Sequence, residues 1–186
     1  AGVPKAVREL AHTLPYNDLA SLDTLLARHR DQVAAVIMEP FNFYEPGDGY
    51  LEGVKRVAHK HGAVLIFDEI CTGFHLGLGG AQKLFGVTPD LATFGKGMGN
   101  GYPISCIVGR TDIMRVFDDV FFSFTFAGDV AAMAAAMTVL DVLEHTDALA
   151  RMEEAGSRLR GGTLALAEEA TLGDRFRIDG RPAWHL

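Results

Sequence analysis

The sequence predicts an α/β domain built on a mostly parallel sheet. Two short apolar runs, at 34–38 (AAVIM) and 63–67 (AVLIF), have the length and composition of buried parallel strands. A helical pattern at 50–61 lies between them, and this strand–helix–strand order is typical of a right-handed parallel crossover. The composition agrees: the 186 residues are 48% hydrophobic and 22% charged, as in an ordinary globular domain.

Local signals predict the other elements in turn. Ser21 to Arg30 is an amphipathic helix with Ser21 as its N-cap. The turn Pro46–Gly49 precedes the crossover helix, and Gly62 closes that helix as its C-cap. Beyond the second strand the sequence is rich in glycine and loop-like. Four later elements are predicted: strands at 91–94 and 104–108, and helices at 129–144 and 148–166.

The C-terminal part indicates a second, smaller α+β domain that is just beginning. Phe176–Ile178 has the alternating pattern of a strand, and the apolar stretch Arg181–Leu186 resembles the start of another. We therefore expect a large-domain core over residues 1–150, and a linking helix with the start of a small domain over 151–186. Because the chain also lacks an initiator methionine, we expect it to be part of a longer protein.

Charge and composition exclude several classes of protein. The net charge is −7 and the 17 basic residues are scattered, which argues against a nucleic-acid surface. No apolar run approaches the roughly 20 residues that span a bilayer, and there is no signal-peptide pattern. Cys71 and Cys106 are too few for a disulfide scaffold or a metal cluster. We expect a cytoplasmic protein without a metal site.

Two carboxylates follow the two apolar strands, where ligands gather in open α/β sheets. Asp68 comes directly after 63–67, and Glu39 directly after 34–38. A carboxylate at the end of an apolar strand loses solvation, so it needs a cationic or hydrogen-bonding partner. For Asp68 a ligand contact and a structural cap or ion pair are equally open. For Glu39 a structural role is favoured over catalysis.

Lys96 lies in a run of alternate glycines, Gly95-Lys96-Gly97-Met98-Gly99-Asn100-Gly101. Glycines let the backbone approach a planar or anionic ligand, and a lysine with a lowered pKa can form a Schiff base. The alternative is a solvated surface lysine. Spacing rejects a P-loop, since the first glycine position is Asp90. It also rejects a dinucleotide fingerprint, because Pro103 follows the glycines and leads into a strand.

Two segments carry a resemblance to a known family. LIFDEICTGF (65–74) and GAQKLFGVTPDLATFGKGMGNGYPISCIVGR (80–110) resemble the class III aminotransferases, which are pyridoxal phosphate (PLP) enzymes of fold type I. Within that class the sequence is most similar to the glutamate-1-semialdehyde aminomutase-like branch. The resemblance extends from about Tyr16 to Gly156. It implies the large domain of that fold, with PLP as cofactor and an amino donor and a carbonyl acceptor as substrates.

The resemblance also implies roles for individual residues. Asp68 would pair with the protonated pyridine nitrogen, and Ile70 would pack against a face of the ring. Lys96 would form the Schiff base and then move a proton between substrate carbons. Thr125 would contact the cofactor phosphate of the neighbouring subunit, which implies a homodimer. The helix that starts near Asp129 can bind an anion at its N-terminus if its N–H groups there are free. A plain helix-capping role for Thr125 is equally open.

Several positions depart from the family pattern. His75 stands where an arginine is usual, Phe124-Thr125 replaces a common Gly-Thr, and Asp129-Val130 replaces a common Asn-Pro. The family's N-terminal part, which supplies a phosphate-binding loop, an aromatic that stacks on the ring and substrate contacts, is not found in this sequence. We therefore hypothesise that the isolated chain binds PLP weakly and turns over poorly or not at all.

The function predicted is transfer, or intramolecular shift, of an amino group through a Schiff base on Lys96. One alternative is another fold type I reaction, such as decarboxylation or racemisation, which uses the same lysine and aspartate. A second is a non-catalytic scaffold, which would have no need to keep Asp68, Lys96 and Thr125 together. The substrate is not identified, because the aromatic segment 41–44 either lines a pocket or packs in a loop.

Overall fold

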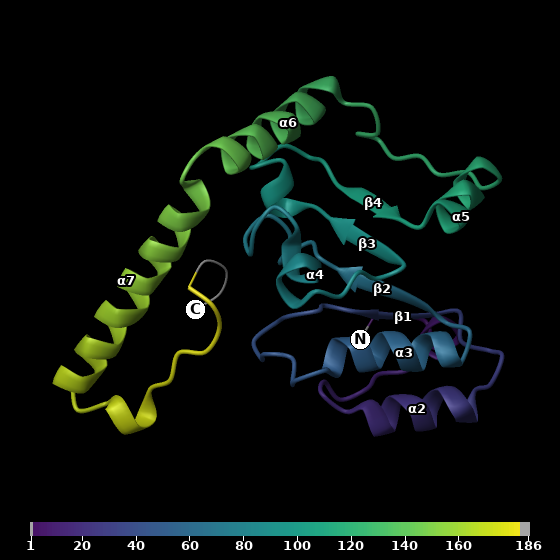
Figure 1. The fold of residues 1–186 in the computed structure, drawn as a ribbon, viewed down its shortest axis with the longest axis horizontal. Helices are drawn as coiled ribbons and strands as arrows, with labels where there is room; N and C mark the ends of the chain where they lie inside the picture. The colour runs from purple at the N-terminus through teal and green to yellow at the C-terminus, as the bar shows by residue number, and fades with distance from the viewer. Residues whose placement is uncertain (1, 183–186) are drawn as a thin grey trace.

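The computed structural model describes residues 2–182, so the apolar stretch at 183–186 lies outside the described residues. Its centre is a four-stranded sheet in the order β1-β2-β3-β4 (Figure 1). The strands are β1 (Ala35–Met38), β2 (Val64–Asp68), β3 (Leu91–Phe94) and β4 (Cys106–Gly109). The first three are parallel, and β4 is antiparallel to β3. The predicted mostly parallel α/β sheet is confirmed.

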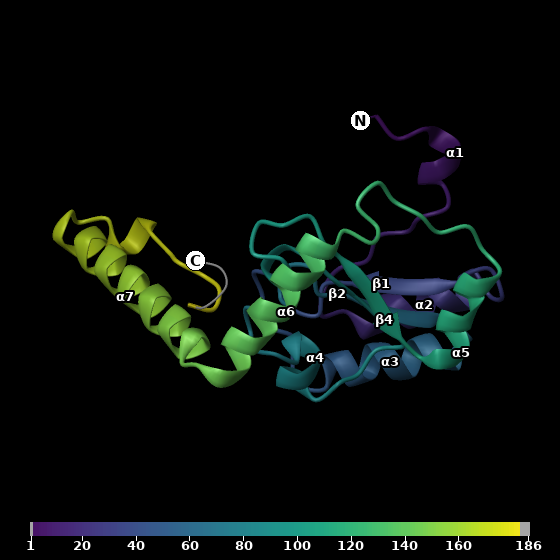
Figure 2. The ribbon, with the colours of Figure 1, turned by 90° about the horizontal axis from the view of Figure 1, so that it is seen from above.

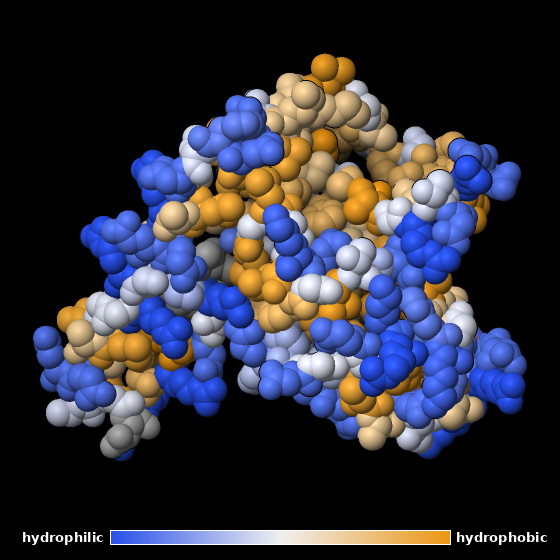
Figure 3. All heavy atoms as spheres, viewed as in Figure 1, coloured by the Kyte–Doolittle hydropathy of each residue, from blue (hydrophilic) through white to orange (hydrophobic). Residues whose placement is uncertain are grey.

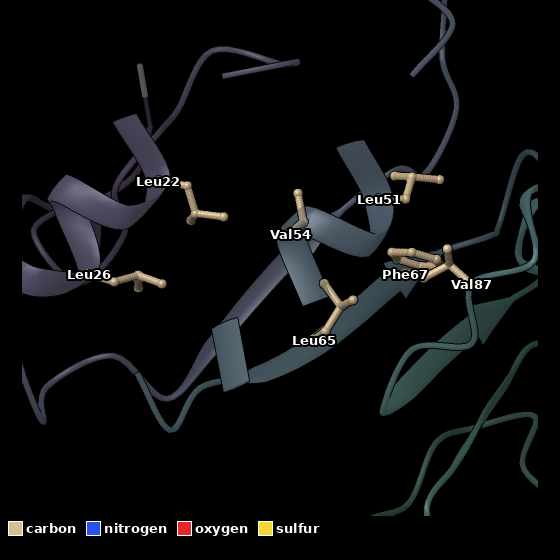
Figure 4. Close-up of a cluster of buried hydrophobic side chains, with 7 residues drawn as sticks. All are labelled: Leu22, Leu26, Leu51, Val54, Leu65, Phe67 and Val87. Atoms are coloured by element: carbon tan, nitrogen blue, oxygen red, sulfur yellow. The ribbon is translucent and has the colours of Figure 1, made fainter. Parts of the chain in front are cut away.

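Helices α2 (Leu19–Arg28) and α3 (Tyr50–Lys60) cover one face of the sheet, as Figures 1 and 2 show. The core lies between them and β2, where Leu65 and Phe67 are fully buried. Removing such side chains from water stabilises the fold by about 1.5–3 kcal/mol each. Figure 4 shows the buried cluster, which consists of Leu22, Leu26, Leu51, Val54, Leu65, Phe67 and Val87. On the opposite face, Ile37 of β1 is 64% exposed.

The start of α2 differs from the prediction. Asp18, not Ser21, is the N-cap: its Oδ1 accepts a hydrogen bond from the Ser21 backbone N–H at 2.9 Å. The Ser21 hydroxyl donates to Oδ2 of Asp18 at 2.6 Å. Ser21 therefore lies in the first turn, because the carboxylate three residues earlier already satisfies its free N–H group. The helix also ends at Arg28, not at Arg30.

Helix α3 ends one residue earlier than predicted. His61 is its C-cap, and Gly62 follows with a φ of +74°, the left-handed conformation in which glycine commonly terminates helices. Strand β2 then begins at Val64 and includes Asp68 as its last residue. Asp68 is thus part of the hydrogen-bonded sheet, in register with Thr93 of β3.

Short helices were not predicted from the sequence. They are α1 (Lys5–Arg8), α4 (Gly80–Phe85), α5 (Thr111–Met114) and the 3₁₀ turns η1 (Lys96–Met98), η2 (Arg115–Asp118) and η3 (Gly173–Arg175). None is long enough to show a helical period in the sequence. Two of them matter for the site: α4 follows the DEICTGF turn, and η1 contains Lys96.

The two long helices were predicted correctly, with small shifts at their ends. They are α6 (Val130–His145) and α7 (Ala148–Glu169). Helix α7 leaves the body as an arm, and the C-terminal segment returns beside it (Figures 1 and 2). The strand predicted at Phe176–Ile178 is wrong: these residues form no strand, because no neighbouring strand in residues 2–182 supplies hydrogen bonds.

The segment beyond η3 contacts the body of the protein. The Arg181 side chain forms a salt bridge of 2.7 Å with Glu45. Its guanidinium lies 5.6 Å from the ring centres of both Phe41 and Phe85. Within residues 2–182, no helix combines the length and the apolar character needed to cross a membrane.

Candidate active site

The carboxyl ends of β1, β2 and β3 bring together the charged residues that the sequence analysis selected. Glu39 follows β1, Asp68 ends β2, and Lys96 comes two residues after β3. Parallel strands end at the same edge of a sheet, so the three side chains face a common region. The two carboxylates are close enough to Lys96 to favour its charged form. The expected pair of Asp68 and Lys96 is therefore present at this edge.

Asp68 is fixed on one side and open on the other. Its Oδ1 accepts hydrogen bonds from the Ile70 backbone N–H at 3.0 Å and from the Thr93 hydroxyl at 3.2 Å. Its Oδ2 has no hydrogen-bond partner among residues 2–182. A half-buried carboxylate with one oxygen available can accept a hydrogen bond from a cationic ligand such as a protonated ring nitrogen.

Lys96 occupies a constrained position in η1. Its φ is +42°, in the left-handed region, and the residue is exposed. Gly97 packs against the His75 ring so closely that an added Cβ would lie 2.8 Å from the Cε1 atom of His75. A side chain at position 97 would therefore force the His75 ring to move. On the other side of the lysine, Ile70 lies beside Gly95, where an added Cβ would be 3.6 Å from Cγ2 of Ile70.

The pKa of Lys96 is raised, whereas a nucleophilic amine needs a lowered one. The main cause is a hydrogen bond from Nζ to the Cys71 thiol, followed by the charge interaction with that group. Partial desolvation acts in the opposite direction, and the charges of Glu39 and Asp68 add smaller raising effects. A cation bound to Asp68 would neutralise that carboxylate and so remove its raising effect on the Lys96 pKa.

Glu69 is a residue that the sequence analysis overlooked. It is fully buried, and its carboxylate accepts hydrogen bonds from the Thr72 hydroxyl (2.7 Å) and from the backbone N–H groups of Ala81 (2.7 Å) and Gln82 (2.8 Å). It therefore caps α4 and ties that helix to the turn after β2. The sequence does contain Glu69 and, further along, the glycine pair Gly79-Gly80. No sequence pattern indicates, however, that the carboxylate and the glycines meet in the fold.

His75 stands next to the lysine turn, at the position where the family resemblance implies an arginine. Its Nδ1 lies 3.0 Å from the Cys71 carbonyl oxygen, and its ring covers Gly97. No carboxylate among residues 2–182 lies within salt-bridge distance of it. At this position the histidine therefore packs against Gly97 and stabilises the turn through the Cys71 carbonyl oxygen.

Thr125 lies apart from this cluster. It is exposed in the turn before α6, and no hydrogen bond joins it to Asp68 or Lys96 within the described part of the chain. The expectation of free N–H groups at the start of α6 is wrong for two of them. Asp129 accepts hydrogen bonds from the N–H groups of Ala131 (2.9 Å) and Ala132 (3.4 Å), so its own carboxylate takes the place of an anion.

Two cavities lie elsewhere, and neither is lined by Asp68 or Lys96. One, of about 930 Å³, is an open groove along β1 and α2 that includes Glu39. The other, of about 460 Å³, lies between the segment 41–45 and the C-terminal segment, and Phe43 and Tyr44 line it. Phe41 also lines this cavity, and its side chain is fully buried. At the Asp68–Lys96 cluster, Lys96 is exposed and Asp68 is half-buried.

Comparison with known proteins identifies relatives along almost the whole chain. The family model "Aminotransferase class-III" matches residues 1–180. The glutamate-1-semialdehyde 2,1-aminomutase of Halobacterium salinarum is 40% identical over 177 residues, which cover 91% of this chain and 40% of that protein.

Solved structures agree with that match. An omega-transaminase from Sphaerobacter thermophilus superimposes with a TM-score of 0.81 at 31% identity, over 90% of this chain and 40% of that one. The FumI protein of Sphingopyxis sp. MTA144, solved in its PLP internal aldimine form, gives a TM-score of 0.84 at 27% identity, over 91% and 42%. The chain therefore spans about two-fifths of the length of these relatives.

Proposed function

The chain belongs to the class-III aminotransferase family, and from this premise we propose that its protein uses PLP to move an amino group from an amino compound to a carbonyl compound, or within one molecule. The observation that carries the proposal is the pairing, at one sheet edge, of the exposed Lys96 amine with Asp68, whose Oδ2 is open to a ligand. A scaffold would not need to keep a carboxylate oxygen free beside an amine.

The residues at this edge fit PLP. When bound, PLP supplies an aldehyde that an amine can attack and a ring that accepts electrons. Asp68 would accept a hydrogen bond from the ring nitrogen and keep that nitrogen protonated. Ile70, half-buried beside Gly95, would offer an apolar contact to a face of the ring.

Lys96 has two tasks in the proposed reaction. Its Nζ must first lose a proton, because only the neutral amine is nucleophilic. Once substrate has displaced it, the same atom can take a proton from one substrate carbon and return it to another. The left-handed backbone between two glycines fixes the point where the lysine side chain leaves the chain. The exposed side chain can still move between the two substrate carbons.

We propose a homodimer, with Thr125 contacting the cofactor phosphate of the neighbouring subunit. The exposed segment that contains Thr125 is rich in apolar side chains: Phe121 is 96% exposed and Phe124 is 63% exposed. The apolar surface continues onto α6 through Val130 and Met137, and Figure 3 shows it at the top of the molecule. Exposed patches of this kind are typical of subunit interfaces. A second copy would cover the patch and bring Thr125 of one subunit close to the PLP site of the other.

Two further proposals concern the chain as a whole. Residues 1–150 form the PLP-binding core, and residues 151–186 begin a smaller domain. The arm-like course of α7, which buries only Ala167, supports this division. We also propose a cytoplasmic location, which the two free, half-buried cysteines support, since free thiols persist in a reducing compartment.

Reductive labelling of the full-length protein tests the proposed function. The protein is incubated with PLP, reduced with borohydride and analysed by peptide mass spectrometry. We expect the label on Lys96, and none on that peptide in the Lys96→Ala variant. Lys83→Ala is the matched control, because Lys83 is exposed on the neighbouring α4 and should not matter. Label spread over surface lysines, or equal labelling of the two variants, would contradict the proposal. The products formed from amino donors and keto acids then show whether the protein transfers an amino group or decarboxylates its substrate.

A further inference from the structure

The Cys71 thiol is in contact with the Lys96 amine. Nζ of Lys96 donates a hydrogen bond to Sγ of Cys71, although the two residues lie 25 positions apart. Cys71 is half-buried and is not in a disulfide. A thiol in this place touches the atom that the proposed function assigns to covalent attachment of PLP.

The backbone that carries Cys71 is firmly held. The Gly73 N–H donates to the Glu69 carbonyl at 2.8 Å, and the Leu76 N–H donates to that of Thr72 at 3.1 Å. Both Glu69 and Thr72 are fully buried, and their side chains are hydrogen-bonded to each other. The turn therefore presents Cys71 at a position that the core determines.

The backbone that carries Lys96 is also held in place, although the lysine side chain is exposed. Gly95 and Gly97 pack against Ile70 and His75, which belong to the same turn as Cys71. His75 also contacts the Cys71 carbonyl oxygen at 3.0 Å. The two segments thus meet along several residues, and the side chains of Cys71 and Lys96 lie at the open end of this contact.

We propose that Cys71 is a further residue of the cofactor site: its thiol holds the free Lys96 amine in place and lies against PLP once PLP is attached. This inference depends on the proposed function. It implies that attachment of PLP at Lys96 and alkylation of Cys71 exclude each other. Small soft electrophiles are then a class of reagent that blocks the site through Cys71.

Cys106 provides a control within the same molecule. It lies on β4, it is also half-buried, and its thiol contacts Sδ of Met98 at 3.8 Å. Burial raises the pKa of the Cys106 thiol, so less of it is in the reactive thiolate form. Among the described residues no hydrogen bond joins it to Lys96, so PLP should not alter its reaction rate.

The test is competitive alkylation of the full-length protein after its cofactor has been removed. Iodoacetamide forms a bond from Sγ to its methylene carbon, releases iodide, and leaves the thiol proton to solvent. Alkylation of the two cysteines is followed by peptide mass spectrometry with and without PLP. With PLP at about 100 times its Kd, we expect Cys71 to react about 100-fold more slowly. The rate at Cys106 should not change.

Borohydride labelling of Lys96 on the same samples separates the two hypotheses. If Lys96 is labelled but PLP does not slow alkylation of Cys71, the inference about Cys71 is wrong and the proposed function stands. If Lys96 is not labelled, both are wrong. This comparison uses the wild-type protein, so it does not depend on how a variant folds.

The reverse experiment uses two matched variants. Wild-type protein treated first with iodoacetamide should attach little PLP at Lys96. Cys71→Ser, which keeps a small hydrogen-bonding group that resists the reagent, should attach as much PLP after the treatment as the same variant attaches without it. Cys106→Ser should remain blocked like the wild type. If treatment blocks Cys71→Ser as strongly as the wild type, Cys71 is not the residue through which the site is closed.

Discussion

Asp68 and Thr93 are register partners across β2 and β3, and the Thr93 hydroxyl donates a hydrogen bond of 3.2 Å to Oδ1 of Asp68. The backbone N–H of Ile70 contacts the same oxygen at 3.0 Å. Together they hold the carboxylate so that Oδ2 remains available at the sheet edge. Lys96 lies three residues beyond Thr93, so one pair of adjacent strands positions both the carboxylate and the amine.

Asp68→Asn should reduce both PLP retention and turnover in the full-length protein. A charge-assisted hydrogen bond contributes about 1.5–3 kcal/mol, so we expect a loss of roughly 10- to 150-fold. PLP affinity is measured by absorbance titration, and kcat at saturating PLP. Thr93→Val is the control, because it removes one hydrogen bond to Oδ1 and keeps the charge. An equal loss in both variants would indicate that Asp68 acts only through the sheet.

Gly80→Ala should destabilise the protein more than Gly86→Ala. Both glycines have positive φ, +61° and +72°, so each alanine costs about 1–2 kcal/mol of backbone strain. An added Cβ meets no atom within 4 Å at Gly86, but at Gly80 it collides with the buried Glu69 carboxylate. Disturbing that carboxylate adds about 1–3 kcal/mol. Urea unfolding measures the difference, and equal midpoints would show that the Glu69 cap contributes little.

Asp90→Asn should destabilise the protein at neutral pH but not near pH 2. Burial acts to raise the Asp90 pKa, but hydrogen bonds from the Leu65 N–H, His59 and Arg110 outweigh it and lower the pKa from 3.8 to about 2. The carboxylate therefore contributes stability above its unfolded pKa, and this contribution is lost as pH falls from about 4 towards 2. The shift corresponds to about 2 kcal/mol.

Unfolding midpoints of the wild type and Asp90→Asn, measured from pH 7 to pH 2, check this expectation. The control is Asp112→Asn, because Asp112 also binds Arg110, at 2.6 Å, but is exposed. Solvent screens such pairs, so little change is expected at any pH. A constant difference between Asp90→Asn and the wild type across the range would contradict the assigned pKa.

Phe121→Glu should weaken the proposed dimer. Phe121 is 96% exposed near Thr125, and a charge placed in an apolar interface lacks a partner. We expect the dissociation constant, measured by sedimentation, to rise at least about tenfold, the equivalent of 1.4 kcal/mol. Phe121→Leu keeps the surface apolar and should remain dimeric. Identical sedimentation of all three proteins would place the subunit contact elsewhere.

Much of the fold could be predicted from the sequence because its signals are local. A buried strand needs only a short apolar run, and a helix such as α6 needs only a continuous stretch of helix-forming residues. The turn around Lys96 was equally visible, since its glycines are adjacent in the chain. The Asp68–Lys96 pair then followed from the rule that parallel strands end at one edge.

Errors occurred where local signals compete or are short. At α2 both Asp18 and Ser21 are good N-caps, and only the folded backbone decides which of them accepts the first N–H. Helix α4 has six residues, too few for a period. The alternation at Phe176–Ile178 did not produce a strand, because a strand also requires a neighbour that alternation alone does not supply.

The sequence by itself determined the mostly parallel sheet, the family resemblance and the candidate lysine and aspartate. Only the tertiary structure decided that Glu69 caps α4 and that Cys71 contacts Lys96. The physical reason is that these contacts join residues 12 and 25 positions apart whose separation has no periodic or spacing signature. Such contacts arise when strands pair and turns pack, so they are properties of the folded chain and not of any segment of it.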